Sequence, residues 1–142
     1  MKNMLNHITL RVNDLEKSKK FFLATLAPLG YKLFVEKEKS AGFGQVDVEG
    51  NRDFWIHEGK VSEVKSFSCL AFTASSKEAV ETFYNAALEA GGKDNGVPGY
   101  RPQYHRGYYA AFVHDLDGYN IEAVWDDLEK LRGSGYMAPH KL

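Results

Sequence analysis

Side chains that commonly bind divalent metals stand at four places where strands are predicted: His7, His57, Cys69 and Glu122. Neutral imidazole, thiolate and carboxylate are the usual protein ligands of such ions. Glu122 is the most informative, because it lies in "HDLDGYNIEAVW" (114–125), a tight Asp/Gly turn followed by an alternating strand. A carboxylate in the middle of such a strand must be solvated, paired or metal-bound, since burying it alone is far too costly.

Strand alternation predicts which of these side chains share a face. The apolar residues of 8–12 alternate and are expected to lie under a helix, which leaves His7 and Arg11 on the opposite, open face. In the last strand the same reasoning leaves Glu122 on the open face. We therefore expect His7 and Glu122 to converge as metal ligands in a cup-shaped sheet. A second interpretation stays open for Glu122, a carboxylate that is paired with Arg11 or hydrogen-bonded in a wet cup.

A third ligand is required, because two ligands alone bind a metal weakly. His57, in "DFWIHEGK", shares the parity of Asp53 and Trp55 and would serve if its strand reaches the cup. Cys69 stands at the position equivalent to His7 in an internal repeat described below. Its thiolate can ligate zinc or iron, whereas a free Cys is often only a small buried apolar residue. Both residues are candidates.

The loop "GYRPQYHRGYY" (99–109) is rich in aromatic and cationic side chains. Such side chains can stack on and clamp an anionic or planar ligand. We assign substrate contacts to Arg101, Tyr104 and His105, together with Arg11 on the first strand. The alternative is a solvated loop that its aromatic residues anchor to the sheet.

The elements that must position these residues occur twice. Residues 7–30 align with residues 69–92 at a constant offset of 62 positions. Each copy begins with a strand of period two and continues as an amphipathic helix. Turn residues then separate short strands near 31–37, 43–48 and 53–58 in the first copy, and near 97–104, 108–114 and 119–125 in the second. The predicted fold class is α+β, with two βαβββ modules that form a cupped mixed sheet.

The helix starts carry a shared signal. Asn13 with Glu16, and Ser75 with Glu78, have the spacing of a capping box. The chain is predicted to be one domain over 1–142, with modules at 5–58 and 66–126, a link at 59–65, and a short helix and tail at 127–142.

Composition excludes several classes of protein. The chain is 44% hydrophobic, 26% charged and 13% aromatic, an ordinary globular balance. Its net charge of −1 provides no basic field for nucleic acid. One cysteine cannot form an internal disulfide, the first residues lack a signal-peptide layout, and no apolar run is long enough to span a membrane. We expect a cytoplasmic protein.

Taken together, these features resemble the vicinal oxygen chelate superfamily, which includes glyoxalase I, bleomycin-resistance proteins, extradiol dioxygenases and fosfomycin-resistance enzymes. The resemblance covers about residues 5–126 and is clearest in "GVPGYRPQYHRGYYAAFVHDLDGYNIEAVW". It implies ligands on the first strand of each module and on the last strand of the second. His7 and Glu122 match this pattern, and Cys69 stands where the family usually has His. Aligning the turns "EGNR" and "DGYN" places Phe54 opposite Glu122, so the optional ligand of the first module is missing.

Two functions follow from the resemblance. The first is an enzyme of glyoxalase or dioxygenase type that binds a divalent zinc, iron, manganese or nickel ion, with Glu122 as both ligand and catalytic base. The second is a metal-free protein of the bleomycin-resistance type that sequesters a small planar, drug-like molecule in the cup. In either case we expect a homodimer, with modules paired within one chain or exchanged between chains.

Overall fold

The computed structural model describes residues 5–65 and 67–133. The element order repeats the pattern βαβββ, with a 3₁₀ turn after the first helix and a short helix after the last strand. The first module contains β1 (Ile8–Val12), α1 (Leu15–Leu26), η1 (Ala27–Leu29), β2 (Tyr31–Glu36), β3 (Ser40–Gln45) and β4 (Phe54–Glu58). The second contains β5 (Leu70–Thr73), α2 (Lys77–Glu89), β6 (Lys93–Tyr100), β7 (Tyr108–His114) and β8 (Asn120–Asp126), and α3 (Leu128–Leu131) follows it. The predicted fold class is confirmed.

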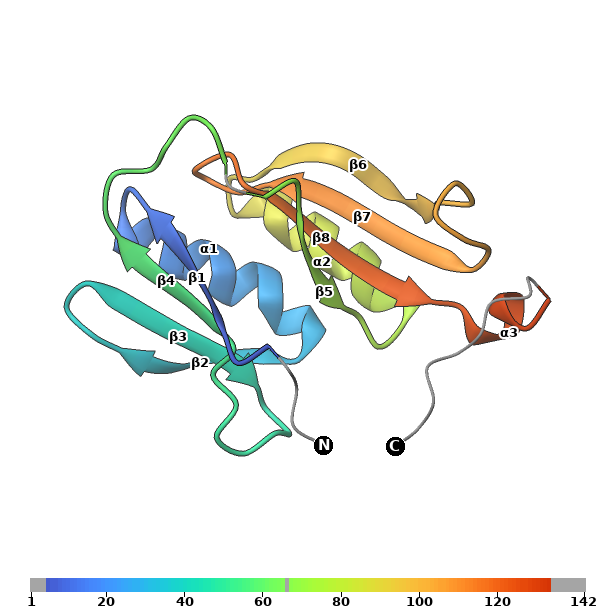
Figure 1. The fold of residues 1–142 in the computed structure, drawn as a ribbon, viewed down its shortest axis with the longest axis horizontal. Coiled ribbons are helices and arrows are strands. Elements are labelled where there is room, and N and C mark those ends of the chain that lie inside the picture. The colour runs from blue at the N-terminus through green and yellow to red at the C-terminus, as the bar shows by residue number, and fades with distance from the viewer. Residues whose placement is uncertain (1–4, 66, 134–142) are drawn as a thin grey trace.

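The strands form two four-stranded sheets within the chain, ordered β1-β4-β3-β2 and β5-β8-β7-β6. In each sheet the module's first strand lies parallel to its last, and the other pairs are antiparallel. Both helices lie behind the sheets in the view of Figure 1, and they contact each other. The cup predicted from the sequence is therefore not one continuous sheet within a single chain.

Aromatic side chains join the two modules on the helix-covered side of the sheets. Phe54 of β4 makes edge contacts with Phe22 of α1 and with Phe72 of β5, at centroid distances of 4.9 and 5.3 Å. Tyr31 of β2 also meets Phe72 edge to face. Because Phe22 and Phe54 are almost fully buried, this cluster fixes the two sheets relative to each other.

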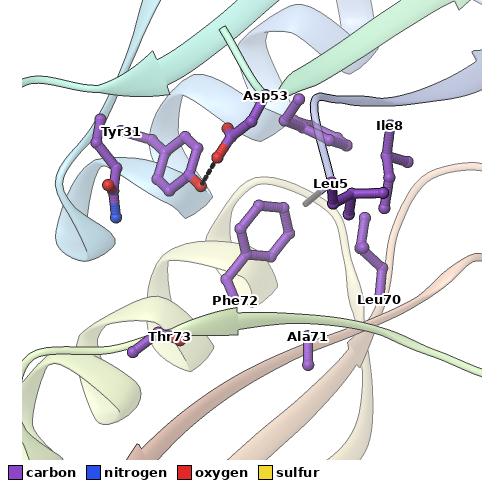
Figure 2. Close-up of a pocket in the computed structure, with 10 residues that line it drawn as sticks. Leu5, Ile8, Tyr31, Asp53, Leu70, Ala71, Phe72 and Thr73 are labelled. Carbon is purple, nitrogen blue, oxygen red and sulfur yellow. Dashed lines mark hydrogen bonds between the residues drawn. The ribbon is translucent and has the colours of Figure 1, made fainter. Parts of the chain in front are cut away.

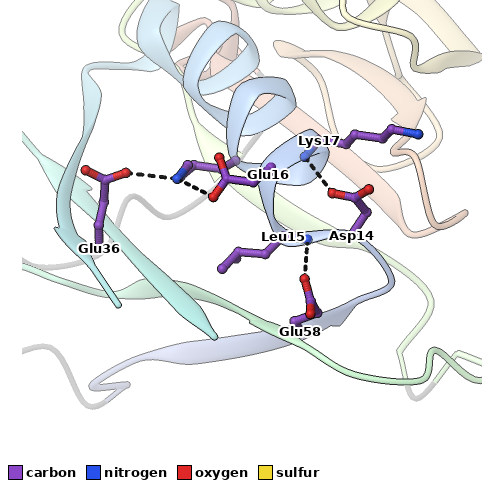
Figure 3. Close-up of polar contacts among 7 residues, drawn as sticks. Asp14, Leu15, Glu16, Lys17, Glu36 and Glu58 are labelled. Carbon is purple, nitrogen blue, oxygen red and sulfur yellow. Dashed lines mark hydrogen bonds and ion pairs between the residues drawn. The ribbon is translucent and has the colours of Figure 1, made fainter. Parts of the chain in front are cut away.

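Both helices begin one residue later than the capping boxes predict. Asp14, not Asn13, caps α1 and accepts from the backbone N–H of Lys17, while Glu58 of β4 accepts from the N–H of Leu15 (Figure 3). The side chain of Asn13 instead donates to Asp117. The sequence prediction was wrong here because a tertiary contact occupies Asn13 and leaves the cap to its neighbour.

The second helix shows the same shift, since Ser76 rather than Ser75 accepts from the N–H of Ala79. Two strands also begin earlier than predicted, at Ser40 and Lys93, because hairpin pairing extends them beyond their apolar patterns. The short helix predicted after residue 126 is present as Leu128–Leu131, and the tail from residue 134 onward lies outside the described residues. Among the described helices, none is long and apolar enough to cross a membrane.

The turn before β8 is built around a buried carboxyl group. Asp115 is 5% exposed, and its Oδ1 accepts from the backbone N–H groups of Asp117 and Tyr119 at 3.0 and 2.8 Å. Gly118 supplies the positive φ of 84° that closes the turn. Burial raises the pKa of Asp115 to about 6, against the lowering effect of those N–H donors. This turn sets the start of β8 and therefore the position of Glu122.

We predict that Asp115 makes stability depend on pH. Because its pKa is higher in the folded than in the unfolded chain, its stabilising contribution is complete below pH 4 and is lost as pH rises through about 6. Relative to Asp115→Asn, the wild type should lose about 2–3 kcal/mol of unfolding free energy between pH 4 and 7. Urea unfolding at several pH values measures this difference. The exposed control Asp47→Asn should follow the wild type, and a pH-independent difference for Asp115→Asn would contradict the prediction.

Candidate functional site

Glu122 lies on the open face of the second sheet and is only 3% exposed. The hydroxyl of Tyr108, on β7, donates a short hydrogen bond to its Oε1. The thiol of Cys69, just before β5, lies 3.6 Å from its Oε2 and donates to it. The register explains this grouping, because Glu122 pairs with Ala71 of β5 and with Phe112 of β7, which places all these side chains on one face.

The two donors respond to the buried carboxylate. Burial raises the pKa of the Cys69 thiol, and the negative charge of Glu122 raises it further. The pKa of Tyr108 rises well above its usual range for the same two reasons, with burial again the larger. Both groups therefore stay protonated at neutral pH and act as neutral donors to Glu122.

The predicted substrate contacts of the loop lie against side chains of β7 that share the open face with Glu122. The guanidinium of Arg101 lies 5.7 Å from the ring centroid of Phe112, on the open face, and donates to the carbonyls of Val97 and Gly99. Tyr104 and His105 each meet the ring of Tyr108 edge to face. His105 also contacts Asp126, with Nε2 and Oδ1 at 3.2 Å. The structure therefore brings three predicted contacts to the face that carries Glu122.

His7 and His57 lie elsewhere, on the open face of the first sheet. Both line a hollow of about 490 Å³ together with Trp55 of β4. His7 has Nδ1 2.7 Å from the side-chain oxygen of Asn6, and His57 is exposed on β4. The first sheet thus carries two imidazoles, and the second carries a thiol and a carboxylate.

Within a single chain the structure does not bring together the four predicted metal ligands His7, His57, Cys69 and Glu122, and the ligand set stays a prediction. Among residues 5–65 and 67–133, no group of three or more His, Cys, Asp or Glu side chains is placed to hold a metal ion. The physical reason is that the modules form separate sheets, so that each carries part of the set.

Arg11 contacts the second module but does not pair with Glu122. Its carbonyl oxygen accepts from the hydroxyl of Tyr119 at 2.8 Å, and its side chain lines a shallow hollow with Lys60 and Lys65. Arg11 is therefore not the partner of Glu122, which is instead hydrogen-bonded by Tyr108 and Cys69.

The register also corrects the alignment of the two modules. Ile8 pairs with Phe54, and its equivalent Leu70 pairs with Ile121, so the residue equivalent to Glu122 is Trp55 and not Phe54. Phe54 is buried against the helices. The error arose because the turns used for the alignment belong to connections of different length. No ligand occupies this position of the first module in either alignment.

Sequence reasoning did not assign roles to Tyr108 or Trp55, although both lie on open faces. Strand parity was the available signal for each of them, but the partner of Tyr108 depends on a β7–β8 register that the sequence does not specify. Lys37 and Arg52, which also line the hollow beside Trp55, were missed because they lie at the end of a strand and in a loop.

A second cavity lies at the seam between the modules and contains none of the predicted site residues. It measures about 290 Å³ and is lined mostly by apolar side chains, among them Ile8, Leu70 and Phe72 (Figure 2). Tyr31 donates to Asp53 across it at 3.1 Å, and burial together with the Asp53 charge raises the pKa of Tyr31. Both residues belong to the first module, so this polar pair is separate from the Glu122 cluster.

Comparison with known proteins agrees with this architecture. The family model described as Glyoxalase/Bleomycin resistance protein/Dioxygenase superfamily matches residues 4–123. A glyoxalase/bleomycin resistance protein from Albidiferax ferrireducens is 30% identical, with a TM-score of 0.73 over 87% of this chain and 98% of that chain. Comparison with curated proteins gives no match.

Two further solved structures share this fold. A mutant of the fosfomycin resistance protein FosX from Listeria monocytogenes, complexed with manganese(II) and a dihydroxypropylphosphonic acid, is 21% identical over 92% of this chain and 95% of that chain, with a TM-score of 0.67. At this identity the likeness shows the fold alone. A glyoxalase I mutant from Zea mays is 28% identical with a TM-score of 0.67, and the match covers 88% of this chain but only 47% of the maize chain.

The Tyr108 hydrogen bond generates a stability prediction. Tyr108→Phe leaves Glu122 buried with a weak thiol donor, so we expect the free energy of unfolding at neutral pH to fall by about 1–3 kcal/mol. Tyr104→Phe is the matched control, because Tyr104 is 59% exposed, and it should change stability by less than about 0.5 kcal/mol. Urea unfolding gives both values. When Tyr108→Phe is introduced into Glu122→Gln, the free energy of unfolding should fall by less than it does in the wild type. An equal fall in both backgrounds would contradict a hydrogen bond between Tyr108 and Glu122.

Proposed function

Because this chain belongs to the glyoxalase/bleomycin resistance protein/dioxygenase superfamily, we propose that it is a divalent-metal-dependent enzyme that acts on a small molecule with two neighbouring oxygen atoms. The observation that carries the proposal is the buried carboxylate of Glu122, which faces a thiol and neutral hydroxyl rather than a cation. A buried carboxylate of this kind is expensive unless it gains a further partner, which a metal ion would provide.

The thiol and the carboxylate are spaced as two ligands of one ion would be. Bonds of about 2.3 Å to sulfur and 2.1 Å to oxygen, at a tetrahedral angle, place the two ligand atoms about 3.6 Å apart. The Sγ of Cys69 and Oε2 of Glu122 are 3.6 Å apart. This distance also fits the S–H···O hydrogen bond, so the pair can exchange a shared proton for a metal without a large movement. The donor set fits zinc, iron, manganese or nickel with zinc and iron favoured by the thiolate.

We infer that a second copy of the chain completes the site. The second module offers Cys69 and Glu122, and the first offers His7 and His57 on its own open face. A homodimer in which the first module of one copy faces the second module of the other would add an imidazole to the thiol and carboxylate. The edge positions of β1 and β5 leave both sheets available for such an exchange.

The residues around Glu122 have separable roles in this proposal. Tyr108 holds Oε1 and so orients the carboxylate, which leaves Oε2 as the atom that binds the metal or takes a substrate proton. Arg101 is fixed by two carbonyl groups and places a positive charge over the same face, where it would attract substrate oxygens. When bound, the metal would stabilise negative charge that develops on those oxygens. His105 and Tyr104 would border the substrate.

The proposal keeps the remaining expectations from the sequence. The net charge of −1 argues for a small-molecule substrate over nucleic acid, and a single cysteine suits a reducing, cytoplasmic location.

Metal analysis of untagged protein tests the ligand set. We expect bound metal in the wild type and at least a tenfold loss of affinity in His7→Ala and in Glu122→Gln, because each removes a ligand. His114→Ala is the control, since His114 ends β7 and contacts the carbonyl of Gly118, and this variant should keep its metal. Absence of metal from the wild type, or occupancy unchanged by both substitutions, would refute the proposal.

Mixing the two metal-deficient variants shows whether each metal site forms between two chains or within one chain. If sites form between chains, co-refolded His7→Ala and Glu122→Gln proteins regain about one quarter of wild-type metal sites, because half of the dimers are mixed and each mixed dimer has one intact site. If each chain builds its own site, mixing restores nothing.

A metal-free binding protein is the second candidate function, favoured by Cys69 in place of the family's usual His. In this case the aromatic loop would hold a small planar ligand beside Tyr108 without chemistry. A thermal-shift screen of planar drugs and aromatic acids in the presence of a chelator should find compounds that raise the melting temperature with concentration. Tyr104→Ala should weaken these shifts, because Tyr104 is exposed beside Tyr108, whereas Tyr31→Phe should not. No stabilising compound, or no dependence on Tyr104, would count against this function.

A further inference from the structure

We propose that the hollow on the open face of the first sheet is a binding site for a small aromatic anion, such as an aromatic carboxylate. Its lining combines Trp55 with two cations, Lys37 and Arg52, and with the imidazoles of His7 and His57. If the chain is the proposed enzyme, this anion is the class of substrate that it would act on. Binding of the anion does not depend on that function, but its role as a substrate rests on it.

Trp55 forms a rigid aromatic wall of this site. Its indole Nε1 donates to the carbonyl oxygen of Arg52 at 2.9 Å. Its ring lies against Gly42 of β3 so closely that a Cβ atom at position 42 would be 2.9 Å from three ring carbons. The indole is therefore held in one orientation before a ligand arrives, which lowers the entropy cost of stacking a planar ring on it.

The cations of the hollow are held in place without a carboxylate partner. Lys37 lies over the indole, with Nζ 5.6 Å from the ring centroid. The guanidinium of Arg52 stacks 3.8 Å from the ring centroid of Phe34, and its Nη1 donates to the carbonyl oxygen of Asn51. Within the described part of the chain, neither forms an ion pair, and no acidic residue lines the hollow.

Nearby lysines outside the hollow behave differently. Lys39 pairs with Glu58 at 3.1 Å, and Lys19 pairs with Glu16 and Glu36 at 2.9 Å. Unlike these two lysines, Lys37 and Arg52 have no carboxylate beside them, among the described residues, that would compensate for their charge. This charge favours an anion and opposes a cationic ligand of the same shape.

The dimensions suit a single ring with an anionic group. A volume of about 490 Å³ lies within the range of small-molecule pockets. Lys37 and Arg52 line the same hollow as Trp55, so they are the cations available to the anionic group of a ring stacked on the indole. His7 lines the same hollow and belongs to the proposed ligand set, so the bound anion would lie beside the metal site of the assembled dimer.

Titration with benzoate, followed through the two indole N–H signals in NMR spectra, tests the site. We expect the Trp55 signal to shift with benzoate, while the Trp125 signal, from the helix-covered side of the second sheet, stays in place. Lys37→Gln and Arg52→Gln should each weaken benzoate binding about three- to tenfold, whereas Lys39→Gln, the matched control outside the hollow, should leave it nearly unchanged. Benzyl alcohol and benzylamine should bind more weakly than benzoate. Equal binding of all three compounds, or equal losses in Lys39→Gln and Lys37→Gln, would overturn the proposal.

Gly42→Ala provides a second test that keeps every charge. The substitution should weaken benzoate binding, because a methyl group at position 42 displaces the indole of Trp55. If the substitution moves the Trp55 signal of the free protein but leaves the affinity for benzoate unchanged, the indole does not bind the ligand ring as proposed.

The same titration in Glu122→Gln with a chelator separates this inference from the proposed enzyme. Benzoate binding that persists there supports the hollow even if the wild type binds no metal. Metal binding in the wild type without benzoate binding overturns the hollow and leaves the enzyme proposal standing.

Discussion

The burial of one carboxylate constrains the whole second module. Glu122 is nearly inaccessible to solvent, yet its observed donors, Tyr108 and Cys69, are both uncharged. Desolvating a carboxylate costs several kcal/mol unless hydrogen bonds or a cation compensate for it. The surrounding architecture of the described residues positions the two neutral donors but no cation, because the Asp115 turn fixes the start of β8 and the β7–β8 register brings Tyr108 onto the same face. A shift of one residue in that register would turn the carboxylate into the core.

The duplicated module explains why the chemistry is divided. Equivalent positions on the two open faces carry different side chains: His7 corresponds to Cys69, and Trp55 corresponds to Glu122. One face therefore combines an indole and two cations with imidazoles. The other combines a thiol and a carboxylate with Arg101 and the aromatic side chain of Tyr108. The side chains that could bind a metal are thus divided between the two open faces.

Much of the fold was predictable from the sequence because its signals are local. Strand alternation and helix stripes depend on neighbouring residues, and the repeat at an offset of 62 is a direct comparison of two sequence segments. Together these signals predicted βαβββ twice. The candidate site was less predictable, because it depends on tertiary geometry. The cap moved from Asn13 to Asp14 through a contact with Asp117, and the equivalence of Trp55 with Glu122 emerged only from the strand register. Neither signal exists in a single segment.

The proton of Cys69 separates the two candidate functions. With its pKa raised by burial and by Glu122, the thiol is a hydrogen-bond donor that neutral pH does not remove. A metal ion competes for the same sulfur and the same Oε2, and it must release that proton to bind. The hydrogen bond thus gives the Glu122 carboxylate a partner in the absence of metal. It also makes metal binding more dependent on pH than it would be with His at this position. A Cys at position 69 in place of the family's usual His therefore changes two properties of the site. It offers the metal a softer ligand, and it requires a thiol proton to be released before the metal binds.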